Sequence, residues 1–150
     1  MADTLIEVSH IAKTYYSEAG ELPVLHDVNL RIERGEFVAI MGASGSGKST
    51  FMNILGCLDK ASAGQYFLAQ QDVFSLNKDQ LAQLRNQVIG FVFQGFNLLA
   101  RTSLADNVAL PLVYAGVAKA ERQQRALALL DKVGLSRFYH QRPNQISGGQ

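Results

Sequence analysis

The chain has 150 residues, enough for one domain with a buried core, and its 47% apolar and 18% charged residues are ordinary for a soluble globular protein. Its net charge of +1 argues against a dedicated nucleic-acid-binding protein, and a single cysteine excludes an internal disulfide bond. No secretory signal is visible at the N-terminus, and the longest apolar stretch, Val108 to Ala118, is too short to cross a bilayer. We therefore expect a chain of cytosolic character that can work against a membrane partner.

In the first third of the chain, apolar and polar residues follow patterns typical of strands. Leu5 to Ala12 mixes them as a half-buried strand would, and Val24 to Ile32 alternates more clearly before a turn. Phe37 to Met41 is short, wholly apolar and bounded by turns, which predicts a strand buried on both faces, as in a parallel sheet. A helix is predicted from Ser49 to Leu58.

Strands and helices alternate in the remainder of the chain. Two more strands are predicted at Gly64 to Ala69 and Ile89 to Phe93, with a polar helix between them from Lys78 to Val88. Lys119 to Val133 is the clearest helix, and Gly134 follows it, where helices commonly stop. Its apolar stripe consists of Ala126, Leu127, Leu130 and Val133. The alternation of strands and helices predicts an α/β fold.

A phosphate-binding loop lies between the apolar segment and the first helix. Gly42, Gly47, Lys48 and Ser49 satisfy the spacing Gly-x4-Gly-Lys-Ser, which lets backbone amides converge on phosphate oxygens. Lys48 can reach the β- and γ-phosphates and Ser49 can bind Mg2+. The predicted nucleotide-binding residues of this loop are Gly42, Ala43, Ser44, Gly45, Ser46, Gly47, Lys48, Ser49 and Thr50. A glycine-rich turn without a ligand, or a dinucleotide site, explains the Lys-Ser pair less well.

Two further motifs follow this loop. Ile146 to Gln150 resembles the Leu-Ser-Gly-Gly-Gln signature of ATP-binding cassette (ABC) proteins, with Ile in place of Leu. Ile89 to Gln94 resembles the strand that leads into the glutamine loop of the same family. Taken with the phosphate-binding loop (Walker A), these motifs make the chain similar to the nucleotide-binding domain of an ABC transporter.

Within that family the chain resembles the macrolide-export and lipoprotein-release (MacB/LolD-like) branch. The segments that carry this resemblance are Asn53 to Asp59, Leu81 to Phe96 and Asn107 to Gly116, so that it covers essentially the whole chain. It implies a P-loop NTPase (ABC ATPase) core with an N-terminal antiparallel β subdomain and a helical subdomain, incomplete at the C-terminus.

The resemblance also implies roles for individual residues, with ATP and Mg2+ as ligands. Tyr15 matches the aromatic residue that lies under the adenine ring, although an ordinary tyrosine at a strand end is the alternative. Gln94 is implied to approach Mg2+ and the attacking water, with Ser49 as the other protein ligand of the metal; its alternative is a surface amide. The signature residues Ser147, Gly148, Gly149 and Gln150 would cap the γ-phosphate bound by the opposite protomer of a head-to-tail dimer.

The family's Walker B strand, with its aspartate and catalytic glutamate, its D-loop and its switch histidine have no match in these 150 residues. Asp59 and Asp72 stand in contexts that do not match those of the family's acidic residues. Residues 1–150 are therefore expected to form a partial ABC-type ATP-binding domain. We expect it to bind ATP, to hydrolyse it negligibly, and to aggregate readily because an edge of the sheet is left open.

The implied function is that of an ATP-binding subunit or domain that couples ATP binding and hydrolysis to export or membrane extrusion of a macrolide- or lipoprotein-type substrate. The implied partners are a transmembrane permease domain or subunit and a second ABC domain, with no nucleic acid. The implied location is peripheral, at the cytoplasmic face of the inner (plasma) membrane. The alternative is a nucleotide-binding regulatory or interaction module that does not hydrolyse ATP; a GTPase or kinase would not carry the Ser-Gly-Gly-Gln motif.

Three features outside these motifs receive structural interpretations. Cys57, beside Leu55 and Leu58 on a predicted helix, is expected to be a small core residue. The histidines lack a second ligand at metal-binding spacing and are expected in surface or packing roles; they are His10, His26 and His140. The apolar segment from Val108 to Ala118 could contact a membrane subunit or pack in a local core, and both interpretations stay open.

Overall fold

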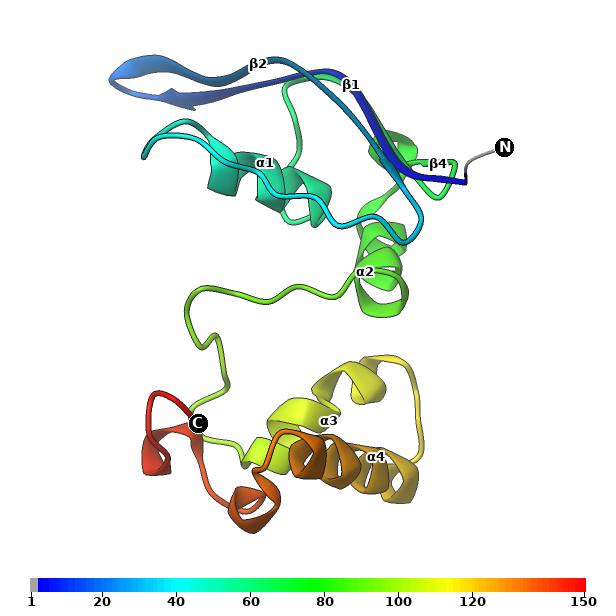
Figure 1. The fold of residues 1–150 in the computed structure, drawn as a ribbon, viewed down its shortest axis with the longest axis vertical. Coiled ribbons are helices and arrows are strands. Elements are labelled where there is room, and N and C mark those ends of the chain that lie inside the picture. The colour runs from blue at the N-terminus through cyan, green and yellow to red at the C-terminus, as the bar shows by residue number, and fades with distance from the viewer. Residues whose placement is uncertain (1–2) are drawn as a thin grey trace. The chain divides into compact units, whose positions relative to one another are not determined.

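The computed structural model describes residues 3–150 and divides into two compact units between Ile89 and Gly90 (Figure 1). The first unit contains β1 (Thr4–Ser17), β2 (Gly20–Glu33), α1 (Lys48–Leu55), β3 (Ala63–Leu68), β4 (Gln71–Asp72), the 3-10 helix η1 (Val73–Ser75) and α2 (Lys78–Gln87). The second contains α3 (Leu104–Tyr114), α4 (Lys119–Lys132) and the 3-10 helices η2 (Ser136–Phe138) and η3 (Pro143–Gln145). No helix between residues 3 and 150 is long and apolar enough to cross a membrane.

The strands of the first unit form one antiparallel sheet in the order β2-β1-β3-β4. Val8 in β1 pairs with Leu30 on one side and with Tyr66 on the other. The pairing of β1 with β3 ends at Ala12, whereas the pairing of β1 with β2 continues to Ser17. Beyond Ala12 the two strands therefore form a hairpin arm with no third strand, which explains why both run further than the apolar pattern predicts. The predicted N-terminal antiparallel β subdomain is confirmed.

The core of the first unit lies between the sheet and helices α1 and α2. Its buried side chains come from β1 (Val8, Ile11), β3 (Tyr66, Leu68), α1 (Phe51, Ile54) and α2 (Leu81, Leu84). The Tyr66 hydroxyl donates a hydrogen bond of 2.8 Å to the carbonyl of Leu55, one of the carbonyls at the end of α1 that lack a partner within the helix. Burial raises the pKa of Tyr66. Cys57 is also buried, as predicted, and burial raises the pKa of its thiol.

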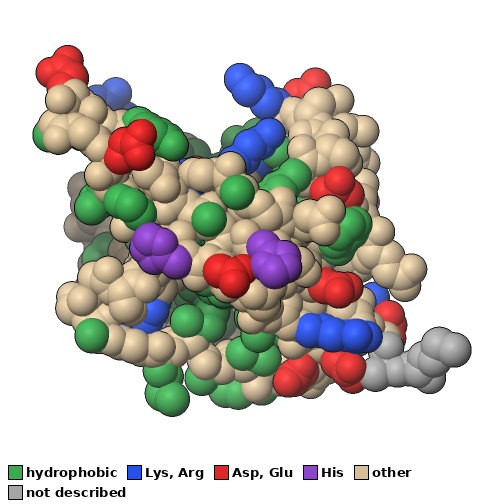
Figure 2. Space-filling view, turned by 90° about the horizontal axis from the view of Figure 1, so that it is seen from above, with side chains coloured by type: hydrophobic (Ala, Val, Ile, Leu, Met, Phe, Trp, Pro, Cys, Tyr) green, Lys and Arg blue, Asp and Glu red, His purple; other side chains and the backbone are tan. Residues whose placement is uncertain are grey.

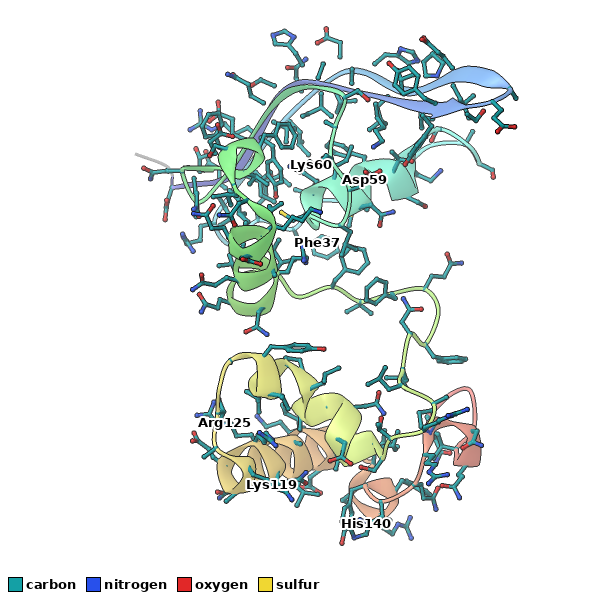
Figure 3. All side chains as sticks on the ribbon, turned by 180° about the vertical axis from the view of Figure 1, so that it is seen from behind. Phe37, Asp59, Lys60, Lys119, Arg125 and His140 are labelled. Carbon is teal, nitrogen blue, oxygen red and sulfur yellow. The ribbon has the colours of Figure 1, made fainter. Side chains whose placement is uncertain are left out.

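Two predicted strands are absent from residues 3–150, and both predictions are wrong. Phe37 to Met41 has no regular secondary structure, and the side chain of Phe37, labelled in Figure 3, is 95% exposed. Ile89 to Phe93 is likewise irregular, and Val92 is 97% exposed. A strand forms only beside another strand that completes its hydrogen bonds. Within the part of the chain that the structure describes, every sheet pairing is used by β1 to β4, so these segments have no partner.

The second unit is built on a helical hairpin of α3 and α4, which lie side by side in Figure 1. Leu104, Ala105 and Leu130 form its buried centre. The Ser103 hydroxyl caps α3 by accepting a hydrogen bond from the Asp106 amide. The apolar segment from Val108 to Ala118 therefore lies partly in α3. The sequence did not predict this helix because Pro111 interrupts the apolar pattern. Ala109 of this segment is buried and Tyr114 is exposed, so the interpretation as local core packing holds for only part of the segment.

The predicted helices of the remaining segments are confirmed with small shifts of their ends. Asn77 and Gln80 form a reciprocal capping box at the start of α2, where each side chain accepts from the other residue's amide at 2.9 Å. Gly134 ends α4 in the left-handed region with φ +75°, and its amide donates to the carbonyl of Asp131. Of the predicted apolar stripe of α4, Ala126 and Leu130 are buried, whereas Leu127 and Val133 are exposed.

We expect Ile54→Ala to lower the free energy of unfolding by about 2–5 kcal/mol, because the fully buried side chain leaves a cavity between α1 and the sheet. Urea unfolding followed by circular dichroism would measure this change. Met52→Ala, at an exposed position of the same helix, is the matched control and should change stability by no more than about 0.5 kcal/mol. Equal losses in the two variants would contradict the placement of this core.

A second prediction concerns the two left-handed glycines before α1. A Cβ on Gly47, with φ +87°, would lie 2.7 Å from Leu25 Cδ2 and 3.0 Å from the Val24 carbonyl oxygen. Gly45 has a similar φ of +80° but no atom within 4 Å of such a Cβ. Gly45→Ala should therefore bear only the backbone cost of about 1–2 kcal/mol. Gly47→Ala should lose about 1–3 kcal/mol more in urea unfolding, because of the added clash. The same loss in both variants would show that Gly47 does not closely approach β2.

Candidate functional site

The predicted phosphate-binding loop leads directly into α1. Gly47 is the N-cap residue of this helix, and its carbonyl accepts a hydrogen bond of 2.8 Å from the Phe51 amide. Within the described chain, no side chain caps α1 and its first turn holds no acidic residue. The first amides of the helix and the positive end of its dipole are therefore open to an anion. This arrangement matches the binding of phosphate at a helix N-terminus.

The ammonium group of Lys48 lies over the loop from which it emerges. Its Nζ donates to the carbonyl of Gly42 at 2.9 Å, to the carbonyl of Ala43 at 2.6 Å and to Ser46 Oγ at 3.3 Å. All three acceptors are uncharged, and no ion pair of Lys48 with a carboxylate occurs among residues 3–150. The loop thus concentrates one positive charge that its own contacts leave uncompensated, next to the amides at the helix start.

The hydroxyls of the first helical turn are the candidate ligands for a metal that accompanies the phosphates. Ser49 is exposed and Thr50 half-buried, and neither hydroxyl has a hydrogen-bond partner in the described part of the chain. Nor do the described residues hold a group of three or more His, Cys, Asp or Glu side chains able to bind a metal ion. An uncharged oxygen ligand such as the Ser49 hydroxyl fits Mg2+, which is usually held by few protein groups together with water and phosphate.

Tyr15 lies at the hairpin arm, opposite Leu22 of β2. Its side chain is 40% exposed, and its hydroxyl donates to Asp59 Oδ2 at 3.0 Å. The neighbouring Tyr16 is 71% exposed and has no hydrogen bond between residues 3 and 150. The structure therefore distinguishes the two tyrosines, although the role of Tyr15 under an adenine ring stays a prediction.

Sequence reasoning missed the two residues that hold Tyr15. Lys13 Nζ lies 2.7 Å from Asp59 Oδ1 and 4.7 Å from the centre of the Tyr15 ring. Partial burial raises the pKa of Asp59, but hydrogen bonds from Lys13, the Lys60 amide and Tyr15 outweigh it and leave this pKa below its usual value. Figure 3 shows Asp59 and Lys60 on the segment after α1. Lys13 shares the strand parity of buried Ile11, the one sequence signal that could have indicated an inward-facing lysine.

Gln94 and the signature belong to the second unit, whereas the loop and Tyr15 belong to the first. The side chain of Gln94 is exposed. The signature forms a tight turn after η3, in which the amide and the hydroxyl of Ser147 donate to Gln150 Oε1 at 2.9 and 3.0 Å. Gly148 and Gly149 lie exposed at the centre of this turn. A Cβ on Gly148 would lie 3.7 Å from the Phe96 ring. The functional roles of these residues stay predictions.

The three histidines lie at the surface, where the sequence predicted them to be in surface or packing roles. His10 Nδ1 lies 2.6 Å from Asp27 Oδ1 in an exposed pair on the β1–β2 hairpin, and the hydrogen bond from His10 lowers the pKa of Asp27. Histidine and acidic side chains lie together on the face seen in Figure 2. His26 and His140 are also exposed, which agrees with the predicted surface role.

The relatives of the chain are export proteins. Over all of its 150 residues it is 50% identical to the macrolide export ATP-binding/permease protein MacB of Vibrio parahaemolyticus. Over an alignment of 151 residues it is 53% identical to the pyoverdine export ATP-binding/permease protein PvdT of Pseudomonas putida. In both cases the match covers 100% of this chain but only 23% of the relative, so the chain spans about a quarter of the length of these proteins.

Solved structures of an ATP-binding cassette share the fold. The dimeric post-hydrolysis structure of the cassette MJ0796 bound to ADP and Pi superposes with a TM-score of 0.89 at 43% sequence identity. The dimeric structure of MJ0796, described as a bacterial ABC transporter cassette, gives a TM-score of 0.90 at the same identity. Each match covers 97% of this chain and 65% of the solved chain. The fold is therefore that of an ABC ATPase cassette, matched over about two thirds of the length of the solved chains.

The family-level match agrees with the order of the motifs and with the geometry of the loop. The sequence matches the family described as ABC transporter over residues 25–150, which include the phosphate-binding loop, Gln94 and the signature. The chain therefore belongs to the ABC transporter family.

Proposed function

We propose that this chain is the nucleotide-binding part of an ABC exporter of the macrolide- or lipoprotein-type branch, and that residues 42–50 hold the triphosphate of ATP. The observation that carries this proposal is the position of Lys48. Its ammonium contacts three uncharged oxygens of the loop, at the start of α1, whose first amides no side chain caps in the described chain. A triphosphate brings several negative charges to this one cation and to these amides.

The contacts of Lys48 also suggest how binding proceeds. Because carbonyl and hydroxyl acceptors hold the ammonium more weakly than charged phosphate oxygens, Lys48 can exchange the carbonyls of Gly42 and Ala43 for the β- and γ-phosphates. The α-phosphate is assigned to the first turn of α1, where Thr50 supplies a hydroxyl. ATP binding thus needs only local movement of one side chain in a loop whose backbone is set by its glycines.

From the family resemblance, Ser49 and Gln94 are each proposed as ligands of Mg2+. The Ser49 hydroxyl stands on the first turn of α1 without a competing partner between residues 3 and 150, and the Gln94 amide oxygen is an exposed, uncharged ligand. When bound, Mg2+ neutralises phosphate charge. Neither side chain carries a charge, so the phosphates must supply the anionic ligands.

The exposed signature supports a role toward a second cassette. Ser147, Gly148, Gly149 and Gln150 present a hydroxyl and backbone amides at the surface, and glycine permits close approach of a phosphate. The solved MJ0796 cassettes are dimeric, which supports pairing of the same kind in this chain. The other proposed partner is a transmembrane permease domain or subunit, since the relatives are named ATP-binding/permease proteins. The proposed location is peripheral, at the cytoplasmic face of the inner membrane.

Lys48→Ala should lower the affinity for ATP about ten- to hundredfold, because it removes a charged hydrogen-bond donor to phosphate. Equilibrium dialysis with ATP and Mg2+ would measure the change. Lys132→Ala, at the exposed last turn of α4, is the matched control and should bind as the unchanged chain does. Circular dichroism would establish that both variants keep their helices. ATP affinity unaffected by Lys48→Ala would refute the proposed function.

Ser147→Ala should separate nucleotide binding from pairing. Each protomer should bind ATP with unchanged affinity, because Ser147 is assigned to the nucleotide of the opposite protomer. ATP-dependent dimerisation should weaken about tenfold for the loss of a hydrogen bond to a charged group. Sedimentation velocity with and without ATP would measure this, with Ser136→Ala, an exposed serine of η2, as control. A dimer unaffected by Ser147→Ala would remove the signature from the proposed interface.

A further inference from the structure

Lys13 is the one buried charged side chain that the structure describes between residues 3 and 150. The residue is 9% exposed and lies on β1 among apolar neighbours such as Ile11. Its Nζ donates to Asp59 Oδ1 at 2.7 Å and to the carbonyl of Lys60 at 2.6 Å. A buried ammonium is costly unless it is paired and hydrogen-bonded, and both conditions are met here. The proposed phosphate site makes no use of this pair.

The same carboxylate reaches the tyrosine two positions further along β1. Asp59 Oδ1 accepts from Lys13 and from the Lys60 amide, while Asp59 Oδ2 accepts from the Tyr15 hydroxyl at 3.0 Å. Lys13 and Tyr15 share a face of the strand because side chains alternate along it. Lys13 Nζ consequently lies 4.7 Å from the centre of the Tyr15 ring, in cation–π range. The ring is therefore held at its hydroxyl and on one face.

Tyr16 provides an internal comparison. It points to the other side of the strand, is 71% exposed, and has neither a hydrogen bond nor a cation over its ring in the described residues. Of two adjacent tyrosines at the hairpin arm, only Tyr15 is fixed. Its 40% exposure, with the hydroxyl bonded and one face covered by Lys13, leaves the opposite face of the ring for a flat partner.

We propose that Lys13 and Asp59 are positioning residues that hold the Tyr15 ring so that its free face receives the base of the bound nucleotide. This inference rests on the proposed function, because the nucleotide is the one whose phosphates residues 42–50 are proposed to hold. The phosphate loop and the Lys13–Tyr15–Asp59 clamp then act on different parts of the ligand. Loss of the clamp weakens the interaction with an aromatic base and leaves the interaction with phosphates intact.

The experiment compares ATP with inorganic tripolyphosphate, which has the phosphates but no base. Tyr15→Phe keeps the ring and removes its hydroxyl, and Asp59→Asn removes the charge that pairs with Lys13. Each variant should bind ATP about three- to tenfold more weakly, as expected for one lost hydrogen bond, and should bind tripolyphosphate as the unchanged chain does. The double variant should lose less ATP affinity than the sum of the two single losses, because Tyr15 and Asp59 are in direct contact and act through the same ring. Tyr16→Phe is the matched control.

A spectroscopic readout keeps the test independent of affinity. In chain labelled with 13C-tyrosine, the ring signals of Tyr15, assigned by their loss in Tyr15→Phe, should shift in Asp59→Asn while those of Tyr16 stay in place. Unchanged ATP affinity in both single variants, additive losses, or equal losses for ATP and tripolyphosphate would each overturn the clamp. If the unchanged chain bound neither ligand, the proposed nucleotide site itself would fail, and the clamp with it.

Discussion

The close approach of Gly47 to β2 fixes the position of everything that follows in the phosphate-binding loop. A Cβ there would lie 2.7 Å from the Leu25 side chain, so the backbone at the start of α1 lies directly against the sheet. Phe51 and Ile54 of α1 fill the core beneath the strands and hold the helix against the sheet. Because one face of α1 is buried and its N-cap residue lies against the sheet, the amide-bearing end of the helix is fixed in place, while the loop before it is open to solvent.

Sequence reasoning yields specific site residues where a function imposes a local pattern. The residues of the loop could be identified because glycines, a lysine and a serine must stand at fixed spacing around a phosphate. It failed at Phe37 to Met41 and Ile89 to Phe93, because an apolar run indicates only that a segment can be buried. Whether it becomes a strand depends on a neighbouring strand, and the described sheet supplies none. Helix α3 was not predicted because Pro111 lies inside it, where proline normally disfavours a helix.

The contact between Lys13 and Asp59 illustrates a different limit. The two residues are 46 positions apart, and Tyr15 and Asp59 are 44 apart, so no spacing rule connects them. Strand parity places Lys13 on the inner face beside Ile11, which is enough to predict that a carboxylate or carbonyl must meet it. The identity of that carboxylate follows only from the fold, because the turn after α1 brings Asp59 back to β1. The proposed nucleotide site thus combines a loop that the sequence motif identifies with contacts that depend on the tertiary structure.

Two lysines of the first unit, Lys13 and Lys48, show how the same side chain can serve different roles. Lys13 is buried and its charge is compensated by a carboxylate at 2.7 Å, so it has little net charge to offer an anion and serves to fix its neighbours. Lys48 is half-buried, and its hydrogen bonds in the described chain are to carbonyl and hydroxyl oxygens alone, so no carboxylate compensates its charge there and its partners are exchangeable. An incoming triphosphate gains more from the uncompensated cation, because no ion pair must be broken first. The absence of a carboxylate beside Lys48 among residues 3–150 therefore supports the proposed phosphate site as much as the presence of the lysine does.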